Sequence, residues 1–223
     1  MKKTFRCKKL PQGLNSKKKK AEYIARSLEA LYPNAACSLD YENDPFRLLV
    51  MARLSAQCTD KRVNIVSKEL FSALPDPKSF AEADIEVIED LIKSCGLYKM
   101  KAKNVKDMST MLVEKYNGEV PSTKDELLSL PGIGIKIANL MMGDLFDDPH
   151  IVPDTHCIRI SHRLGLVSKP DATACLKELE AVIPKEKQSD FCHRIVLFGR
   201  DFCKAQNPLC ENCPINAYSI GEK

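Results

Sequence analysis

The stretch Leu130-Pro131-Gly132-Ile133-Gly134-Ile135-Lys136-Ile137-Ala138 decides the fold of this chain. Its two glycines, with one isoleucine between them, separate two segments, 122–130 and 135–146, in which apolar residues recur at helical spacing. Glycine can adopt positive φ and has no Cβ to block a close approach of the backbone. The stretch therefore predicts two helices joined by a tight glycine turn, a helix-hairpin-helix.

The start of the second predicted helix suits an anion. N–H groups in the first turn of a helix have no acceptor within the helix, and they point beyond its end. A DNA phosphate is such an anion, and contacts to the DNA backbone position a protein without reading sequence. We therefore expect Gly132 and Gly134 to bind DNA. Glycine turns between packed helices are common, so the hairpin taken alone also fits a purely structural turn.

Lys136 is the candidate nucleophile, because it stands in the first turn after Gly134. An uncharged lysine amine attacks carbonyl carbons, including that of a ring-opened nucleotide sugar, and forms a Schiff base. The chain is rich in lysine, and most lysines are solvated surface charges. The position beside the hairpin favours the catalytic interpretation of this one.

Asp154 is the candidate catalytic carboxylate. It follows Pro153 and precedes the apolar-periodic segment 158–164. This position also predicts a helix N-cap, where the side chain accepts a bond from a backbone N–H group. The two roles are compatible, because a carboxylate held in this way can still stabilise a cationic sugar or orient an attacking group. We expect both.

Most of the remaining chain predicts further helices. Apolar residues recur at helical spacing, and no segment shows the sustained alternation that is typical of strands. The predicted fold is therefore all-α, with a core made of packed helix faces. The predicted helical segments are 21–31, 46–56, 63–74, 85–95, 101–116, 122–130, 135–146, 155–164, 173–183 and 191–202.

Composition indicates a mildly basic globular protein of 223 residues, with a net charge of +4 and a pI of about 8.4. This charge is compatible with nucleic acid but proves little. No apolar run approaches the ~20 residues that span a bilayer, and the basic residues at the N-terminus are not followed by the apolar segment of a signal peptide. We therefore expect a soluble, cytoplasmic protein, associated with the nucleoid if the source is bacterial or archaeal. The N-terminal charges are expected to form a solvated, frayed tail; they are Lys2, Lys3, Arg6, Lys8, Lys9 and Lys17 to Lys20.

Three of the ten cysteines have ligand spacing. Cys203, Cys210 and Cys213 form a C-x6-C-x2-C pattern, in a stretch too irregular for a core helix. Thiolates spaced in this way on a loop can hold an iron–sulfur cluster or zinc. In the absence of a signal peptide, the others are expected to be reduced thiols that pack as small buried or neutral residues. They are Cys7, Cys37, Cys58, Cys95, Cys157, Cys175 and Cys192.

Several stretches, taken together, resemble endonuclease III, a family of helix-hairpin-helix DNA glycosylases of base excision repair. The matching stretches are 54–60, 96–98, 117–121, 130–139, 152–156, 199–200 and the three spaced cysteines. They span most of the chain in order, and jointly they are highly specific.

The resemblance implies a bifunctional enzyme that removes oxidised pyrimidines from duplex DNA and then cleaves the abasic strand by β-elimination, with no cofactor needed for the chemistry. Lys136 would be the Schiff-base nucleophile and Asp154 its carboxylate partner. Gln57 and Leu97 would fill the space left by the flipped nucleotide, and His156 would contact DNA. Relatives that only excise a base lack this lysine, so Lys136 implies strand cleavage.

The resemblance also implies two helical lobes. Residues 38–148 would form a six-helix barrel that includes the hairpin, and residues 1–37 with 149–223 would form the lobe that carries the cysteine loop. Lys136 and Asp154 would then face each other across the cleft between lobes, where ligand sites tend to lie. The partner would be double-stranded DNA with damaged pyrimidines or abasic sites, bound by a monomer.

Two positions depart from the family pattern. Ile135 stands where the family usually has a basic residue, and Ser219 stands where its fourth cysteine is expected. A hydroxyl is a harder and poorer ligand than a thiolate. Three outcomes stay open: a 4Fe-4S cluster with oxygen, water or a distant cysteine on its fourth iron, a 3Fe-4S cluster, or no metal. We favour a cluster with a structural role. The departures also allow two other functions, a damaged-DNA binding protein that does not cleave and an iron–sulfur redox sensor.

Overall fold

The computed structural model describes residues 13–217, and within that range every regular element is a helix. The predicted all-α fold is confirmed for these residues. The chain forms two compact units: residues 37–147, here the hairpin unit, and residues 1–36 with 148–223, here the cysteine unit. None of the described helices is long and apolar enough to cross a membrane.

The hairpin unit is built around α2, Pro45–Leu54, of which eight residues are buried. A helix that is apolar on all sides belongs in the interior of a domain. Asp44 starts it by accepting bonds from the N–H groups of Phe46 and Arg47, and Pro45 fits its first position. The surrounding elements are α3 (Asp60–Ala73), α4 (Pro77–Glu82), α5 (Ile85–Ile92), η1 (Lys93–Cys95), α6 (Tyr98–Tyr116), α7 (Lys124–Ser129) and α8 (Ile135–Leu145).

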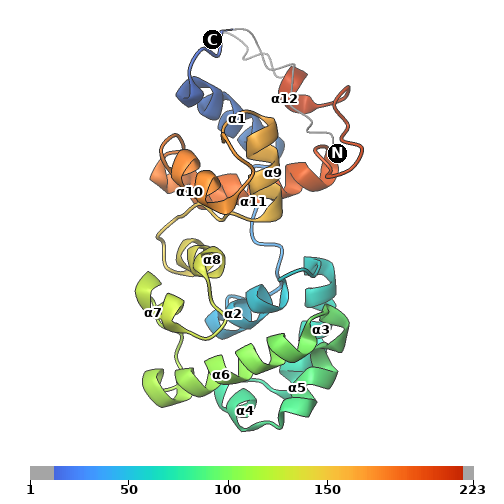
Figure 1. The fold of residues 1–223 in the computed structure, drawn as a ribbon, viewed down its shortest axis with the longest axis vertical. Coiled ribbons are helices and arrows are strands. Elements are labelled where there is room, and N and C mark those ends of the chain that lie inside the picture. Colours follow the sequence, from blue (N-terminus) through green and yellow to red (C-terminus); the bar gives the residue numbers. More distant parts are fainter. Residues whose placement is uncertain (1–12, 218–223) are drawn as a thin grey trace. The chain divides into compact units, whose positions relative to one another are not determined.

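Helix α6 is the longest element of the hairpin unit, and it runs beside α4 and α5 (Figure 1). At the other side it contacts α2. Edge-to-face contacts among Phe46, Phe71 and Phe80, with ring centroids 5.4 to 6.5 Å apart, join α2, α3 and α4 in one apolar core. This core supports both the hairpin and the turns that lead into α3 and α6.

Helix α4 was not predicted from the sequence. It has six residues, and Phe80 is its only buried one, so it is too short for periodicity to show. Its signal is a capping box instead: the Asp76 carboxylate accepts the Ser79 N–H at 2.8 Å, and Ser79 Oγ accepts the Asp76 N–H. Pro77 occupies the first helical position.

The cysteine unit consists of helices packed around α11, Gln188–Asp201, which contacts both α1 and α9. The Tyr23 hydroxyl donates to the Ile215 carbonyl at 2.6 Å and so joins the first and last helices. The other elements are α1 (Lys17–Leu31), α9 (Thr155–Arg163), α10 (Ala172–Glu180), η2 (Lys185–Lys187) and α12 (Pro214–Ala217).

The prediction of a frayed tail is wrong for Lys17 to Lys20. These lysines form the first turn of α1, because the Ser16 side chain accepts the Lys19 N–H and Ala21 is fully buried. Lys17 also pairs with Glu178 of α10. The other charges of the predicted tail, Lys2, Lys3, Arg6, Lys8 and Lys9, lie outside the described residues.

Candidate functional site

The glycine turn lies between α7 and α8, as predicted. Gly132 has φ +78°, whereas Gly134 is the extended N-cap of α8 with φ −111°. The Ile133 N–H donates to the Leu130 carbonyl at 3.1 Å and closes the turn. Only Gly132 therefore uses the left-handed region that glycine makes accessible.

Gly132 is seated on two side chains from other helices. A Cβ at this position would lie 2.8 Å from Asn104 Cβ and 2.9 Å from Arg53 Nε. The Arg53 guanidinium donates to Asn104 Oδ1 through both Nε and Nη2, at 3.1 and 2.6 Å. Sequence reasoning missed this pair, because nothing near residues 53 or 104 points to the hairpin.

Helix α8 presents its N-terminal end to solvent. Gly134, Ile135 and Lys136 are exposed, and within residues 13–217 their backbone N–H groups find no acceptor. The first turn can therefore accept an anion, as predicted. Ile135, 36% exposed, adds an apolar side chain there instead of a charge.

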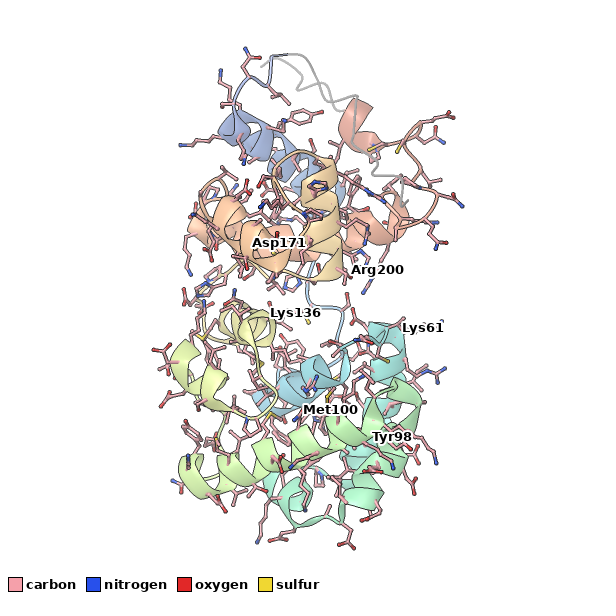
Figure 2. All side chains as sticks on the ribbon, in the orientation of Figure 1. Lys61, Tyr98, Met100, Lys136, Asp171 and Arg200 are labelled. Atoms are coloured by element: carbon pink, nitrogen blue, oxygen red, sulfur yellow. The ribbon has the colours of Figure 1, made fainter. Side chains whose placement is uncertain are left out.

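Lys136 lies in this first turn of α8 (Figure 2). Its ammonium makes no ion pair or hydrogen bond with any described residue of the hairpin unit. Three of the five lysines of α6, Lys101, Lys103 and Lys106, do have acceptors. Lys136 is thus an exposed amine beside a possible phosphate site.

Two turns carry the residues assigned to the space left by a flipped nucleotide. Gln57 lies in the turn 55–59 between α2 and α3, here the Gln57 turn, and Leu97 lies in the turn 96–97 before α6, here the Leu97 turn. Both have left-handed backbone, with φ 53° and 48°. Both side chains are exposed, Leu97 by 51%. An L-residue with a Cβ in this region costs about 1–2 kcal/mol, and such strain concentrates at functional sites.

Asp154 belongs to the cysteine unit and is the N-cap of α9, as predicted. Its backbone is extended, and Oδ1 accepts the Cys157 N–H at 2.6 Å. The cap fixes the position of the carboxylate at the helix start and uses Oδ1, not Oδ2. The predicted site residues are therefore divided between units: Gln57, Leu97, Gly132, Gly134 and Lys136 in the hairpin unit, and Asp154, His156 and the three spaced cysteines in the cysteine unit.

His156 is the second residue of α9, and its side chain packs against α11. A Cβ at Gly199 would lie 2.3 Å from His156 Nδ1, so only glycine leaves room for the imidazole. Arg159 Nη2 lies 3.3 Å from the same nitrogen. The structure therefore gives His156 a packing partner that sequence reasoning did not identify, although Gly199 itself was part of the family resemblance.

The three spaced cysteines lie on the segment 203–213, here the cysteine loop. Arginines of α9 hold its first residues: Arg159 donates to the Cys203 carbonyl at 3.1 Å, and Arg163 donates to the Lys204 and Ala205 carbonyls at 2.7 and 2.9 Å. Arg163 Nη1 also lies 3.5 Å from Cys203 Sγ. Between residues 13 and 217, no three Cys, His, Asp or Glu side chains come close enough to share one metal ion.

The other described cysteines are reduced and mostly buried, as predicted. Cys157 Sγ lies 3.6 Å from Cys175 Sγ in the core of the cysteine unit. Hydrogen bonding with Cys175 and Cys192, together with burial, raises the pKa of the Cys157 thiol well above its usual value. The thiol is therefore neutral and acts as a packing residue. Cys7 lies outside the described residues.

Two family models match the chain. Residues 50–185 match the HhH-GPD superfamily base excision DNA repair protein, and residues 203–218 match the iron-sulfur binding domain of endonuclease III. The first match includes the hairpin, Lys136 and Asp154, and the second begins at Cys203. Together they cover both units.

Known proteins agree with these models over nearly the whole chain. Endonuclease III of Bacillus subtilis (strain 168) is 43% identical over 198 residues, which are 88% of this chain and 90% of the relative. A structure of a non-covalent endonuclease III–DNA complex matches with a TM-score of 0.85 at 42% identity, covering 89% of this chain and 92% of that one. A trapped endonuclease III–DNA covalent intermediate, an estranged-adenine complex, matches with the same TM-score and identity, over 89% and 93% of the two chains. The chain therefore belongs to the endonuclease III family, and it is a base excision repair enzyme that acts as a DNA glycosylase and an abasic-site lyase.

Proposed function

We propose that Lys136 is the nucleophile of this enzyme and that Asp154 is the carboxylate that assists it. The observation that carries the proposal is the exposed Lys136 ammonium in the first turn after the hairpin, for which residues 13–217 offer no ion-pair or hydrogen-bond partner. A relative at 42% identity has been trapped as a covalent intermediate with DNA, which is the product expected from an amine nucleophile. The capped position of Asp154 supports its role, since a fixed carboxylate stabilises developing positive charge without reorganising.

The proposed reaction has two stages. The uncharged Lys136 amine forms a bond to sugar C1′ while the bond from C1′ to the base breaks, and the base leaves with the electron pair and takes up a proton. Asp154 stabilises the positive charge that develops on the sugar. The ring then opens, and the lysine nitrogen loses its protons to give an imine. Because the imine acidifies C2′–H, removal of that proton forms a C2′=C3′ double bond and expels the 3′ phosphate, and water finally releases the enzyme.

The remaining site residues are proposed to hold the DNA. The first turn of α8, with Gly132 and Gly134 before it, would bind a backbone phosphate, and His156 would lie close to DNA as well. Gln57 and Leu97 would enter the duplex where the nucleotide has flipped out, and their exposure and left-handed backbone support this. The flipped base is proposed to be an oxidised pyrimidine, because flipping costs least where a base stacks or pairs badly.

We also propose that Cys203, Cys210 and Cys213 hold an iron–sulfur cluster. The match of residues 203–218 to an iron-sulfur binding domain supports it, as do three soft thiol donors on one loop beside the Arg163 guanidinium. When bound, the cluster would cross-link the loop and would leave the lyase chemistry to Lys136. The residue at the fourth family position, Ser219, lies outside the described residues.

The hairpin unit is proposed to correspond to the barrel lobe of the family, and the cysteine unit to its second lobe. The enzyme is proposed to act as a monomer on chromosomal DNA in the cytoplasm. Lesion-bearing duplex is the proposed substrate, and the relatives solved in complex with DNA support a DNA partner.

Borohydride trapping tests the assignment of the nucleophile. Borohydride reduces the imine to a stable amine and leaves a covalent protein–DNA adduct, so the native protein should give an adduct with abasic duplex. Lys136→Ala should give none and should cleave at least about 1,000-fold more slowly. Lys115→Ala, which removes an exposed lysine of α6 in the same unit, is the control and should trap normally. A full adduct yield from Lys136→Ala would exclude this nucleophile.

Iron analysis tests the cluster. Anaerobically purified protein should contain iron and acid-labile sulfide in roughly equal amounts. Ser219→Cys should slow the loss of iron on exposure to air, because it supplies the missing thiolate. The cluster proposal would be refuted if both the native protein and Ser219→Cys contained no iron after anaerobic purification.

A further inference from the structure

We propose that Lys101 is a positioning residue that holds the Gln57 turn and the Leu97 turn together. The Gln57 and Leu97 side chains can then enter the same gap in the DNA duplex. This inference rests on the roles proposed above for Gln57 and Leu97. It concerns contacts inside the hairpin unit alone.

Lys101 is the only fully buried lysine of the described residues, with 0% of its surface exposed. Its ammonium donates to the Leu54 carbonyl and to the Cys95 carbonyl, both at 2.8 Å. Leu54 is the last residue of α2, just before the Gln57 turn, and Cys95 is the last residue of η1, just before the Leu97 turn. The last carbonyl groups of a helix have no N–H donor within the helix. One side chain of α6 therefore completes the ends of both segments.

Packing alone does not explain a lysine at this place. Burial lowers the pKa of Lys101, which means that the site disfavours the charge it holds. An unbranched apolar side chain would fill a similar space without that cost. What the apolar side chain cannot do is bond the two carbonyls.

A second contact joins the same two turns. Cys58 follows Gln57, Cys95 precedes Gly96 and Leu97, and the two thiols lie within hydrogen-bonding reach of each other. Burial, and then the Cys58 thiol, raise the pKa of Cys95 to about 11, so the thiol is neutral. The turns thus meet at a pair of side chains as well as at the Lys101 ammonium.

The backbone of both turns needs such support. Gln57 and Leu97 adopt left-handed φ angles, and strained residues keep such angles only where the surrounding structure over-determines them. Without the Lys101 ammonium, only the contact between the Cys58 and Cys95 thiols would still join the turns, and a thiol is a weak donor, so each turn could relax more independently. The two exposed side chains would then no longer fill one gap in a duplex.

The test uses Lys101→Met in the full-length protein and two DNA measurements. The first is the ratio of affinities for a duplex with a tetrahydrofuran abasic analogue and for undamaged duplex. The second is fluorescence of 2-aminopurine placed opposite the analogue, which reports that the opposing base has lost its stacking. We expect the affinity ratio to fall about tenfold and the fluorescence rise to shrink.

Cleavage of a single-stranded abasic oligonucleotide separates positioning from general damage. Single strands have no partner base and no gap to fill, so the loss of cleavage on duplex should exceed the loss on single strand by about tenfold. Equal losses on both substrates, or an unchanged affinity ratio, would overturn the inference.

Lys106→Met is the matched control. Lys106 lies on the same helix, and its ammonium also donates to two carbonyls, those of Ala81 and Ala83, at 2.8 and 2.5 Å. These carbonyls belong to the last turn of α4 and to the link from α4 to α5, and neither residue is part of the Gln57 turn or the Leu97 turn. The control should leave the affinity ratio and the fluorescence as in the native protein, and an effect equal to that of Lys101→Met would overturn the inference.

Parallel variants separate this inference from the proposed function. If Gln57→Ala and Leu97→Ala leave the affinity ratio unchanged, the proposed insertion of these residues fails and the inference fails with it. If they lower the ratio and Lys101→Met does not, only the inference fails. Should Lys101→Met not fold, Lys101→Arg replaces it, because it keeps the charge at a different length. It should lower the ratio roughly threefold, and an unchanged ratio would overturn the inference.

Discussion

The glycine hairpin and the cysteine loop both carry predicted site residues, but they are held in different ways. The hairpin turn sits on side chains from the interior of its unit, with Gly132 against Arg53 and Asn104. The cysteine loop is held at its first residues by Arg159 and Arg163, and most of its later residues are exposed. Folding alone shapes the hairpin, whereas the loop depends on surface charges and on the proposed cluster.

This difference has a consequence for function. A site that is shaped before DNA arrives spends no binding energy on its own ordering. A loop that depends on a metal cluster loses its shape when the cluster is lost. Substitutions in the hairpin unit should therefore act on binding and chemistry directly, and substitutions at the loop should act through iron.

After the loss of Lys136, the largest effect should come from Asp154, the one catalytic candidate of the cysteine unit. Asp154→Ser keeps an N-cap for α9, so the unfolding free energy should stay within about 0.5 kcal/mol of native. The turnover number should nevertheless fall at least about 100-fold, because the charge that stabilises the sugar is gone. Steady-state kinetics and denaturant unfolding measure the two quantities.

Asp154→Ala serves as the comparison for that variant. It should lose activity to the same extent and also about 1 kcal/mol of stability, since no cap remains. If activity followed stability across the two variants, with Asp154→Ser nearly fully active, Asp154 would be a cap and nothing more.

The next largest effect should come from Gly132. Gly132→Ala forces a Cβ to within 2.9 Å of Arg53 and Asn104 at φ +78°, so unfolding free energy should fall by about 1–3 kcal/mol. Gly134→Ala is the matched control for stability, because its Cβ meets nothing within 4 Å. Denaturant unfolding should separate the two variants clearly. Equal stability of both would show that the hairpin is not seated as described.

A smaller effect is expected at the cysteine loop. Arg163→Met removes the donor to the Lys204 and Ala205 carbonyls and the charge near Cys203. Iron should leave the protein about tenfold faster in the presence of a chelator. Arg26→Met, which removes an exposed arginine of α1 in the same unit, should lose iron at the native rate. No difference between the two variants would mean that the arginine does not hold the loop.

The smallest effect should be at Glu178, which pairs with Lys17. Hydrogen bonds from Lys17 and from Ser168 lower the pKa of Glu178 to about 2. A depressed carboxylate pKa stabilises the fold above the usual value of 4.5, and this stabilisation is lost as pH falls from there toward 2.

Glu178→Gln should therefore reduce stability at neutral pH by less than about 1 kcal/mol, because Lys17 is exposed and Glu178 partly so, and water screens such a pair. The difference from native should shrink as the pH is lowered below 4.5. Thermal unfolding across that range measures it, with Glu22→Gln, at an exposed pair within α1, as the control. A difference that stayed constant with pH would contradict the assigned cause.

Helices and their caps could be predicted well because their signals are local. Periodicity marked most of the helices, and the positions of Gly132 and Asp154 predicted a turn and a cap that the structure contains. The exceptions are also local: the capping box of α4 was overlooked, and the Ser16 cap extends α1 over lysines that were expected to be frayed. In both cases a capping side chain overrode a weak apolar pattern.

What the amino-acid sequence determined by itself is the helical fold, the hairpin, the candidate amine in the first turn after it, the capped carboxylate and the spaced thiols. Each follows from residues close together in the chain, where spacing alone predicts geometry. Only the tertiary structure decided that Arg53 and Asn104 seat Gly132, that Gly199 makes room for His156, and that Lys101 joins two turns. Those contacts join residues that are far apart along the chain, so no local pattern records them, and packing alone brings them together.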